Sequence, residues 1–241
     1  MQRATRAAVT LLSLRRKGEM IMAKLSETLY NRTKALWDKA TEHPFVTGMA
    51  DGTLEADRFK AYMHQDYYYL KDYTEILGTI KDNADSSVIR DFLDREIEAV
   101  LFETESVHLP NMRRLGITDD EVRNGGKNPA CSDYLAYLRS AAEQGTTRGL
   151  AALLQCSWSY AYIAKTVKEK YPEQVAVSPF ADWFAAYTSE EYVKANAAWI
   201  DMLDSRDVDS TETENLCLIF EKCAGFELRF WDYFLKEDYT A

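Results

Sequence analysis

Helix breakers are scarce along this chain, and their scarcity limits the possible folds more than any other feature. The 241 residues include 5 Pro and 10 Gly, so few positions force the backbone to turn. Between these breakers, apolar residues recur every three or four positions, which is the spacing of a helix with one buried face. No segment shows the strict alternation of a half-buried strand. We therefore expect long helices throughout.

Breakers and capping residues predict where these helices begin and end. A first helix is expected over 25–42. After a turn around Gly48 and Gly52, Thr53 is expected to cap a long helix that runs towards Asn83. A helix is expected over 86–115, with a kink or break at Pro110. Capping boxes predict one helix after Thr118 and Glu121 and the last helix after Thr211 and Glu214. The other helices are expected over 132–143, over 147–170, after Pro179 and over 189–205.

The chain shows no boundary that would divide it into several domains. Its clearest linker, 124–129, is brief, and 46% of its residues are hydrophobic, enough for a substantial core. We predict an all-α helical bundle that forms a single domain over residues 23–241.

Residues 1–22 differ from the rest of the chain, because they carry five basic residues and one acid, Glu19. Three interpretations compete: a transit-like peptide, a signal peptide, or sequence upstream of a true start at Met20 or Met22. We favour the last and treat 1–22 as an N-terminal extension outside the fold.

The charge balance excludes several partners. A net charge of −10 argues against binding to nucleic acid or to an anionic membrane surface. No apolar run is long enough to span a bilayer. The four cysteines form neither a CxxC pair nor a Cys/His array with zinc spacing, which favours reduced thiols in a cytoplasmic protein without a metal site.

Three polar residues interrupt apolar helical stripes, which is where a functional site is expected. Asp66 is the only acid on a face formed by Phe59, Tyr62, Tyr69, Tyr73 and Leu77. Its carboxylate either bonds a neighbouring Tyr for structural reasons or binds an amino or ring N–H group of a ligand.

The other two interruptions are Cys156 and Glu227. Cys156 is either a small inert core residue or a nucleophile with Tyr160 one turn away. Glu227 is either paired with a core Arg or, if desolvation raises its pKa, a general acid near neutral pH. A thiol, two carboxylates and several phenols would suit attack on an electron-poor ring whose nitrogen is protonated.

Five motifs follow one another along the chain and extend these hypotheses. They are Gln65-Asp-Tyr-Tyr-Tyr-Leu70, Tyr134-Leu-Ala-Tyr-Leu138, Ala151-Ala-Leu-Leu-Gln-Cys-Ser-Trp-Ser-Tyr160, Trp183-Phe-Ala-Ala-Tyr187 and Phe226-Glu-Leu-Arg-Phe-Trp231. Together they resemble the TenA/thiaminase II family, the aminopyrimidine aminohydrolases of thiamin salvage. The resemblance covers almost the whole chain from about Lys24 to Phe234. It implies a haem-oxygenase-like helical fold and a homotetramer.

The resemblance also assigns roles to individual residues. Cys156 falls at the family's nucleophile, Glu227 at its acid/base, and Asp66 at the carboxylate that binds ring N3 and the 4-amino group of the pyrimidine. The phenols that line the pocket or bond catalytic groups match Tyr69, Tyr134, Tyr160 and Tyr187. The choice of Tyr134 over Tyr137 depends on where a gap is placed in the loop at 144–145.

The implied reaction is hydrolysis of 4-amino-5-aminomethyl-2-methylpyrimidine to the hydroxymethylpyrimidine and ammonia, and of thiamin to hydroxymethylpyrimidine and thiazole. It requires no metal or organic cofactor, and the sequence leaves the preferred substrate open. A regulatory or ligand-binding protein without turnover is an alternative. A di-iron oxidase is another, because Glu105 and His108 form one Glu-x-x-His motif, although neither His43 nor His64 completes a second.

Overall fold

The computed structural model describes residues 23–239. The N-terminal extension expected over 1–22 lies outside this range. Across the described residues the secondary structure is helical, without strands, as predicted. The helices are α2 (Leu25–Thr41), α3 (Pro44–Asp51), α4 (Ala56–Asp82), α5 (Ser87–Glu103), the π-helical turn η1 (Thr104–His108), α6 (Leu109–Arg114), α7 (Asp119–Asn124), α8 (Pro129–Glu143), α9 (Thr146–Lys170), α10 (Pro172–Val177), α11 (Ala181–Tyr187), α12 (Glu190–Asp204) and α13 (Ser210–Leu235).

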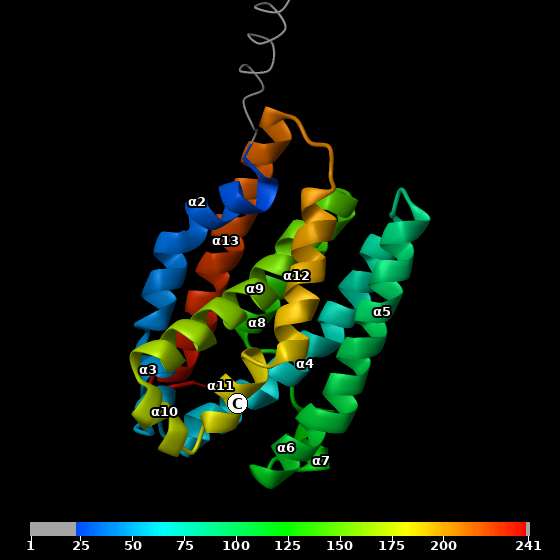
Figure 1. Ribbon diagram of the computed structural model, residues 1–241. Coiled ribbons are helices and arrows are strands. Elements are labelled where there is room, and N and C mark those ends of the chain that lie inside the picture. The colour runs from blue at the N-terminus through cyan, green and yellow to red at the C-terminus, as the bar shows by residue number, and fades with distance from the viewer. Residues whose placement is uncertain (1–22, 240–241) are drawn as a thin grey trace, which may run out of the picture.

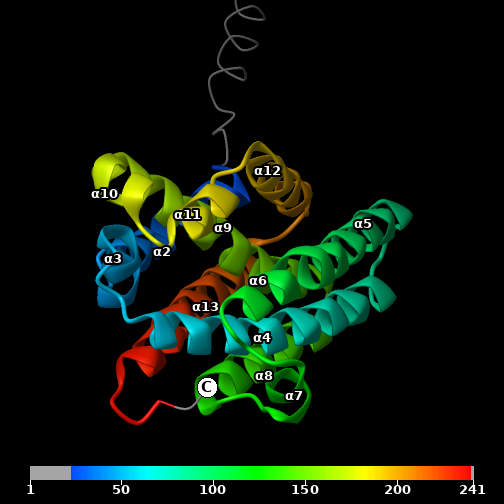
Figure 2. The same cartoon turned by 90° about the horizontal axis from the view of Figure 1, so that it is seen from below.

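Three long helices, α4, α9 and α13, form the centre of the bundle (Figure 1). Helix α8 packs against all three of them, while α2 lies along α13 and α12 along α9. Helix α5 packs against α4 and lies at the edge of the bundle in both views (Figures 1 and 2). The central helices contribute nearly half of the buried residues, and they carry Asp66, Cys156 and Glu227.

Two expected N-caps, Thr53 and Thr211, are wrong. In both cases an aspartate two residues earlier accepts the local hydrogen bonds. Asp51 accepts hydrogen bonds from the backbone N–H and the hydroxyl of Thr53, so Thr53 belongs to a turn, and α4 begins at Ala56. Asp209 caps α13 by accepting from the backbone N–H of Glu212 at 2.8 Å. Thr211 lies inside the first turn of α13, where it cannot serve as its cap.

Other boundaries agree with the sequence more closely. The capping box at Thr118 and Glu121 is confirmed. Gly48 lies inside α3, where a turn was expected, but Gly52 ends that helix at φ 78°, a conformation that glycine adopts without strain. Helix α10 was not predicted, because it is only six residues long.

The expected disruption at Pro110 takes the form of a π-helical turn. Pro110 lacks an amide hydrogen, and its ring crowds the carbonyl one turn earlier. The helix continues past it because the backbone widens over η1, immediately before α6. The wider turn sets the direction of His108 relative to Glu103, the last residue of α5, and both residues line a cavity described below.

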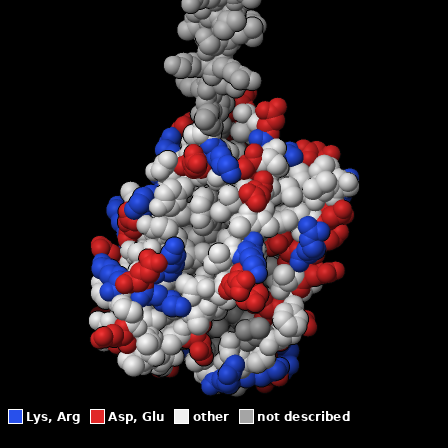
Figure 3. Space-filling model, in the orientation of Figure 1, with Lys and Arg blue, Asp and Glu red and all other residues white. Residues whose placement is uncertain are grey.

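Charged side chains of both signs are mixed on the face of the bundle shown in Figure 3. On the face shown in Figure 3, Lys and Arg alternate with Asp and Glu around a largely uncharged central area. This distribution gives no extended basic surface on that face for a phosphate backbone. None of the helices within 23–239 is both long enough and apolar enough to cross a membrane.

The close approach of α9 to α4 and α8 depends on Gly149, which leads to a stability prediction. A Cβ at this position would lie 2.6 Å from Cγ1 of Ile80 and 3.1 Å from Cα of Ala142. We expect Gly149→Ala to lower the free energy of unfolding by about 1–3 kcal/mol through overpacking. Urea unfolding followed by far-UV circular dichroism measures this change.

Gly78 provides a matched control on α4, because a Cβ there would meet no atom within 4 Å. Gly78→Ala is expected to raise the free energy of unfolding by about 0.5–1 kcal/mol, since alanine loses less backbone entropy in a helix. Equal stability of the Gly149→Ala variant and the wild type would contradict the close packing of these three helices.

Candidate active site

A cavity of about 140 Å³ lies among α4, α5, α9, α11 and α12. Five of the residues singled out in the sequence line it: Asp66 and Tyr69 from α4, Cys156 and Tyr160 from α9, and Tyr187 from α11. Further lining residues are Leu70, Tyr73, Glu96, Ala99, Val100, Glu103, Ser157, Tyr192, Ala195, Asn196 and Trp199. Residues far apart in the sequence thus surround one space.

Glu227 lies behind this cavity wall. It comes from α13 and is only 3% exposed. One carboxylate oxygen accepts a hydrogen bond of 2.8 Å from the hydroxyl of Tyr134, and the carboxylate also interacts with Cys156 and Tyr160. The carboxylate that interrupts the apolar stripe of α13 therefore contacts two side chains that line the cavity.

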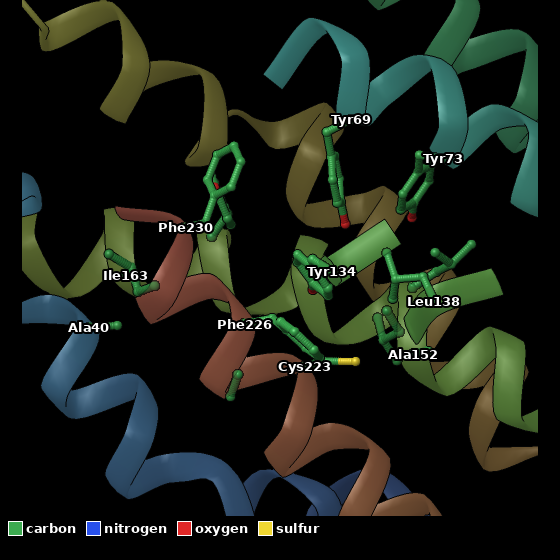
Figure 4. Close-up of a cluster of buried hydrophobic side chains, with 14 of the residues drawn as sticks. Ala40, Tyr69, Tyr73, Tyr134, Leu138, Ala152, Ile163, Cys223, Phe226 and Phe230 are labelled. Atoms are coloured by element: carbon green, nitrogen blue, oxygen red, sulfur yellow. The ribbon is translucent and has the colours of Figure 1, made fainter. Parts of the chain in front are cut away.

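Tyr134 supports Glu227 and does not line the cavity. Its ring is 1% exposed and stacks on Phe226 with centroids 5.2 Å apart and planes 9° apart. Figure 4 shows Tyr134 from α8 and Phe226 from α13 close to Tyr69 of α4, and the ring centroids of Tyr69 and Tyr134 are 5.5 Å apart. Tyr137 packs on Phe226 from outside and is half-buried. Of the two tyrosines, Tyr134 is the one in contact with the site.

The two carboxyl groups of the site are held away from water, and their pKa values rise accordingly. Burial raises the pKa of Glu227 to about 7, although its contacts with Tyr134, Cys156 and Tyr160 act in the opposite direction. Burial also raises the pKa of Asp66 to about 8, with a smaller contribution from Glu103. Near neutral pH both groups can exchange protons, which suits general acid and base catalysis.

The thiol of Cys156 is neutral in the ligand-free site. Burial raises its pKa well above 9, and the negative charge of Glu227 raises it further. A thiolate therefore forms only if a neighbouring group accepts the proton as the sulfur attacks. The Glu227 carboxylate interacts with this thiol and is the base available to it.

The hydroxyl of Tyr69 lacks a strong hydrogen-bond partner at the same cavity. It is buried, and it interacts with the thiol of Cys156, which is a weak hydrogen-bonding group. Buried hydroxyls without a strong partner are costly. A polar atom of a bound ligand would complete the hydrogen bonding of Tyr69.

The other thiols lie outside the cavity. Cys223 is fully buried on α13, and Figure 4 shows it in the apolar cluster with Leu138 and Ala152. Cys131 and Cys217 are also buried and line neither of the two cavities described here. Their burial agrees with core packing.

Sequence reasoning missed several residues around the cavity. Tyr192 and Asn196 come from α12, and Glu96 and Glu103 from α5, on helices whose sequences carried no interrupted apolar stripe. Asn196 accepts a hydrogen bond of 3.0 Å from Ser157, and Glu96 accepts one of 2.6 Å from the indole of Trp199. Only the packing of these helices onto α4 and α9 brings them to the site.

The Glu-x-x-His motif does not form a metal-binding pair. Glu105 is exposed, whereas His108 is buried with Nε2 2.9 Å from the carbonyl oxygen of Met63. Within residues 23–239, no group of three or more His, Cys, Asp or Glu side chains could hold a metal ion.

Over most of its length the chain is similar in sequence to known proteins. A family model described as the TENA/THI-4/PQQC family matches residues 30–237. An aminopyrimidine aminohydrolase from Helicobacter pylori is 34% identical over 215 residues, which cover 87% of this chain and 97% of that protein. An aminopyrimidine aminohydrolase from Halalkalibacterium halodurans is 35% identical over 217 residues, covering 87% and 95%.

Solved structures show the same fold. A TenA homologue from P. horikoshii OT3 superposes with a TM-score of 0.77 at 28% identity, covering 88% of this chain and 98% of that one. Haem oxygenase-1 from the cyanobacterium Synechocystis superposes with a TM-score of 0.56 at 13% identity, covering 87% and 91%, and so shares the fold alone. The predicted haem-oxygenase-like helical bundle is confirmed.

The raised pKa of Asp66 predicts how stability depends on pH. The native state keeps a proton that the unfolded chain releases above about pH 4, so the free energy of unfolding falls between about pH 4 and pH 8. Asp66→Asn removes this loss. We expect its stability relative to the wild type to be about 1–3 kcal/mol higher at about pH 8 than at about pH 4.

Urea unfolding at the two pH values measures the difference. Asp91→Asn, at an exposed position on α5, controls for the loss of a surface carboxylate. An Asp66→Asn variant whose relative stability is the same at both pH values would show that Asp66 ionises as freely in the folded protein as in the unfolded chain.

Proposed function

The chain belongs to the TENA/THI-4/PQQC family, and on that premise we propose that it is an aminopyrimidine aminohydrolase of the thiaminase II type. Family membership confirms the resemblance seen in the sequence. The proposed enzyme hydrolyses 4-amino-5-aminomethyl-2-methylpyrimidine to the hydroxymethylpyrimidine and ammonia, and thiamin to hydroxymethylpyrimidine and thiazole. The observation that carries the proposal is the meeting of Cys156, Asp66 and Glu227 at one cavity.

Asp66 binds the amino edge of the pyrimidine in this proposal. With its pKa near 8, the Asp66 carboxyl is protonated at neutral pH, so it offers one donor and one acceptor. Ring N3 is an acceptor and the 4-amino group is a donor, so the two edges are complementary. Side chains lining the cavity include Asp66, Glu96 and Glu103 but no Lys, Arg or His, which favours neutral or cationic pyrimidines over phosphorylated ones.

Cys156 attacks the ring while Glu227 carries the proton. The sulfur forms a bond to a ring carbon, Glu227 takes the thiol proton, and the same carboxylic acid passes it to a ring nitrogen. Loss of aromaticity allows the substituent on the exocyclic methylene to leave with the electron pair of its C–N bond. Water then adds to the methylene carbon, the sulfur is expelled, and the thiol recovers a proton through Glu227. Protein side chains and water supply every group in this sequence.

A non-catalytic regulator or binding protein is less consistent with the site. Such a protein would need the cavity and Asp66, but it would gain nothing from a thiol beside a buried carboxylate whose pKa is near 7. Release of ammonia from the aminomethylpyrimidine distinguishes the two functions.

We also propose that the enzyme is a homotetramer and acts in the cytoplasm. Val88, Leu101 and Phe102 are exposed apolar side chains on α5, the helix at the edge of the bundle, and contact with another copy would bury them. The four free thiols suit a reducing compartment.

Replacement of the nucleophile gives the first test of the activity. Cys156→Ala is expected to lower kcat for the aminomethylpyrimidine by about a thousandfold or more, because no other thiol lines the cavity. Ammonia release measures turnover, and circular dichroism checks the fold. Cys217→Ala, which removes a buried thiol on α13 outside the cavity, is the control and should remain active. Turnover retained by Cys156→Ala would exclude the proposed nucleophile.

The pH dependence of kcat/KM tests Glu227. Proton transfer from Cys156 requires the Glu227 carboxylate, so we expect kcat/KM to rise with pH through about 7. Glu227→Gln should lower kcat/KM by about a hundredfold or more and remove this rise. Tyr134→Phe removes a hydrogen bond that lowers the pKa of Glu227, so it should move the rise to higher pH. A Glu227→Gln enzyme with near-native kinetics would mean that Glu227 is structural.

A further inference from the structure

A second cavity, about 280 Å³ in volume, adjoins the first and takes no part in the chemistry described above. The two cavities share Asp66, Glu103 and Tyr187 in their walls. Cys156, Tyr69 and Tyr160 line only the first cavity. A ligand held at Asp66 can therefore extend past Glu103 into a second and larger space.

Glu103 is the residue of this shared wall that the proposed chemistry leaves without a role. It is half-buried, and within residues 23–239 its carboxylate forms no hydrogen bond or ion pair. Burial raises its pKa, and His108 beside it would favour the charged form of Glu103 only if His108 were protonated. Burial keeps His108 itself neutral by lowering its pKa, and the bond from Nε2 to the Met63 carbonyl leaves Nδ1 without a proton.

The remaining wall of the second cavity suits a flat cation. Phe59, Phe180 and Trp183 are more than nine-tenths buried and form a firm aromatic surface, with the Phe59 and Phe180 centroids 4.7 Å apart. Asp182 adds a further carboxylate, whereas Arg114 is the basic side chain of the wall. Aromatic faces and carboxylates together favour quaternary or protonated nitrogen.

We propose that the second cavity binds the positively charged substituent of the substrate, with Glu103 as its counter-charge. The inference rests on the proposed function and names its specificity-determining residue. The substituent is an ammonium group in the aminomethylpyrimidine and a thiazolium ring in thiamin, and the larger ring needs the larger cavity.

The chemistry predicts which kinetic parameter Glu103 affects. When the C–N bond breaks, its electron pair leaves with nitrogen, so the positive charge passes from the substituent to the pyrimidine ring and the attraction between the substituent and Glu103 ends. Glu103 thus stabilises the bound substrate more than the products, and its removal should weaken binding without slowing the chemical steps.

Substitution of Glu103 tests the counter-charge. For thiamin, Glu103→Gln is expected to raise KM by about tenfold or more and to leave kcat within about threefold. The Kd of this variant for hydroxymethylpyrimidine should stay within about twofold of the wild-type value when measured by calorimetry, because this neutral ligand has no positive charge for Glu103 to attract. Glu105→Gln, at an exposed position two residues away, is the matched control.

A larger side chain in its wall tests whether the second cavity holds the substituent. Ala186 is exposed on α11 and lines only the second cavity, whereas its exposed neighbour Ala185 lines neither. Ala186→Phe should lower kcat/KM for thiamin about tenfold more than for the aminomethylpyrimidine, and Ala185→Phe should leave this ratio unchanged.

Four results would overturn the inference, and they differ in what they imply. An unchanged KM for thiamin in Glu103→Gln, or an equal loss of hydroxymethylpyrimidine binding, removes Glu103 from the role while the hydrolase activity stands. Equal effects of Ala186→Phe on both substrates exclude the second cavity. A wild-type protein that turns over neither substrate contradicts the proposed function, and the inference fails with it.

Discussion

The hydrogen bond from Tyr134 to the buried carboxylate of Glu227 is the contact on which the rest of the site depends. An isolated carboxylate in the centre of a helical bundle would be too costly to keep, and this bond, with the contacts from Cys156 and Tyr160, makes its burial tolerable. The partners come from α8 and α9, so the site exists only when these helices pack against α13. Correct packing and formation of the site are therefore the same event.

Burial of these groups also sets their chemistry. Desolvation raises the pKa of Glu227 to about 7 and also keeps the Cys156 thiol protonated. Near neutral pH, Glu227 can therefore accept the thiol proton, but the sulfur attacks only when a ligand is bound. Such an arrangement protects the thiol from unproductive reactions in the empty site. The hydroxyl of Tyr69 has only the weakly bonding thiol of Cys156 as a partner at the same cavity, so a ligand can offer it a stronger hydrogen bond.

The irregular turn before Pro110 extends the site beyond the central helices. Because the backbone widens over η1, the helix that begins with α5 continues into α6 and places His108 at the second cavity, which Glu103 at the end of α5 also lines. A regular helix through this segment would turn the side chain of His108 in another direction relative to Glu103. The residues that bind the substituent would then depend on η1. This turn packs against α4 but is not part of the three long helices that hold the reacting groups.

The sequence alone determined the helical class, most helix boundaries, and the three polar residues that mark the site, because helical spacing and the cost of buried polar groups are local properties of the chain. It failed at Thr53 and Thr211, where an aspartate two residues earlier makes the local hydrogen bonds instead, and it did not identify Glu103 or Tyr192, whose helices carry no such interruption. It also could not separate Tyr134 from Tyr137. Tertiary structure decided that choice, the joining of two cavities at Asp66, and the pKa values, since each depends on which helices exclude water from which side chains.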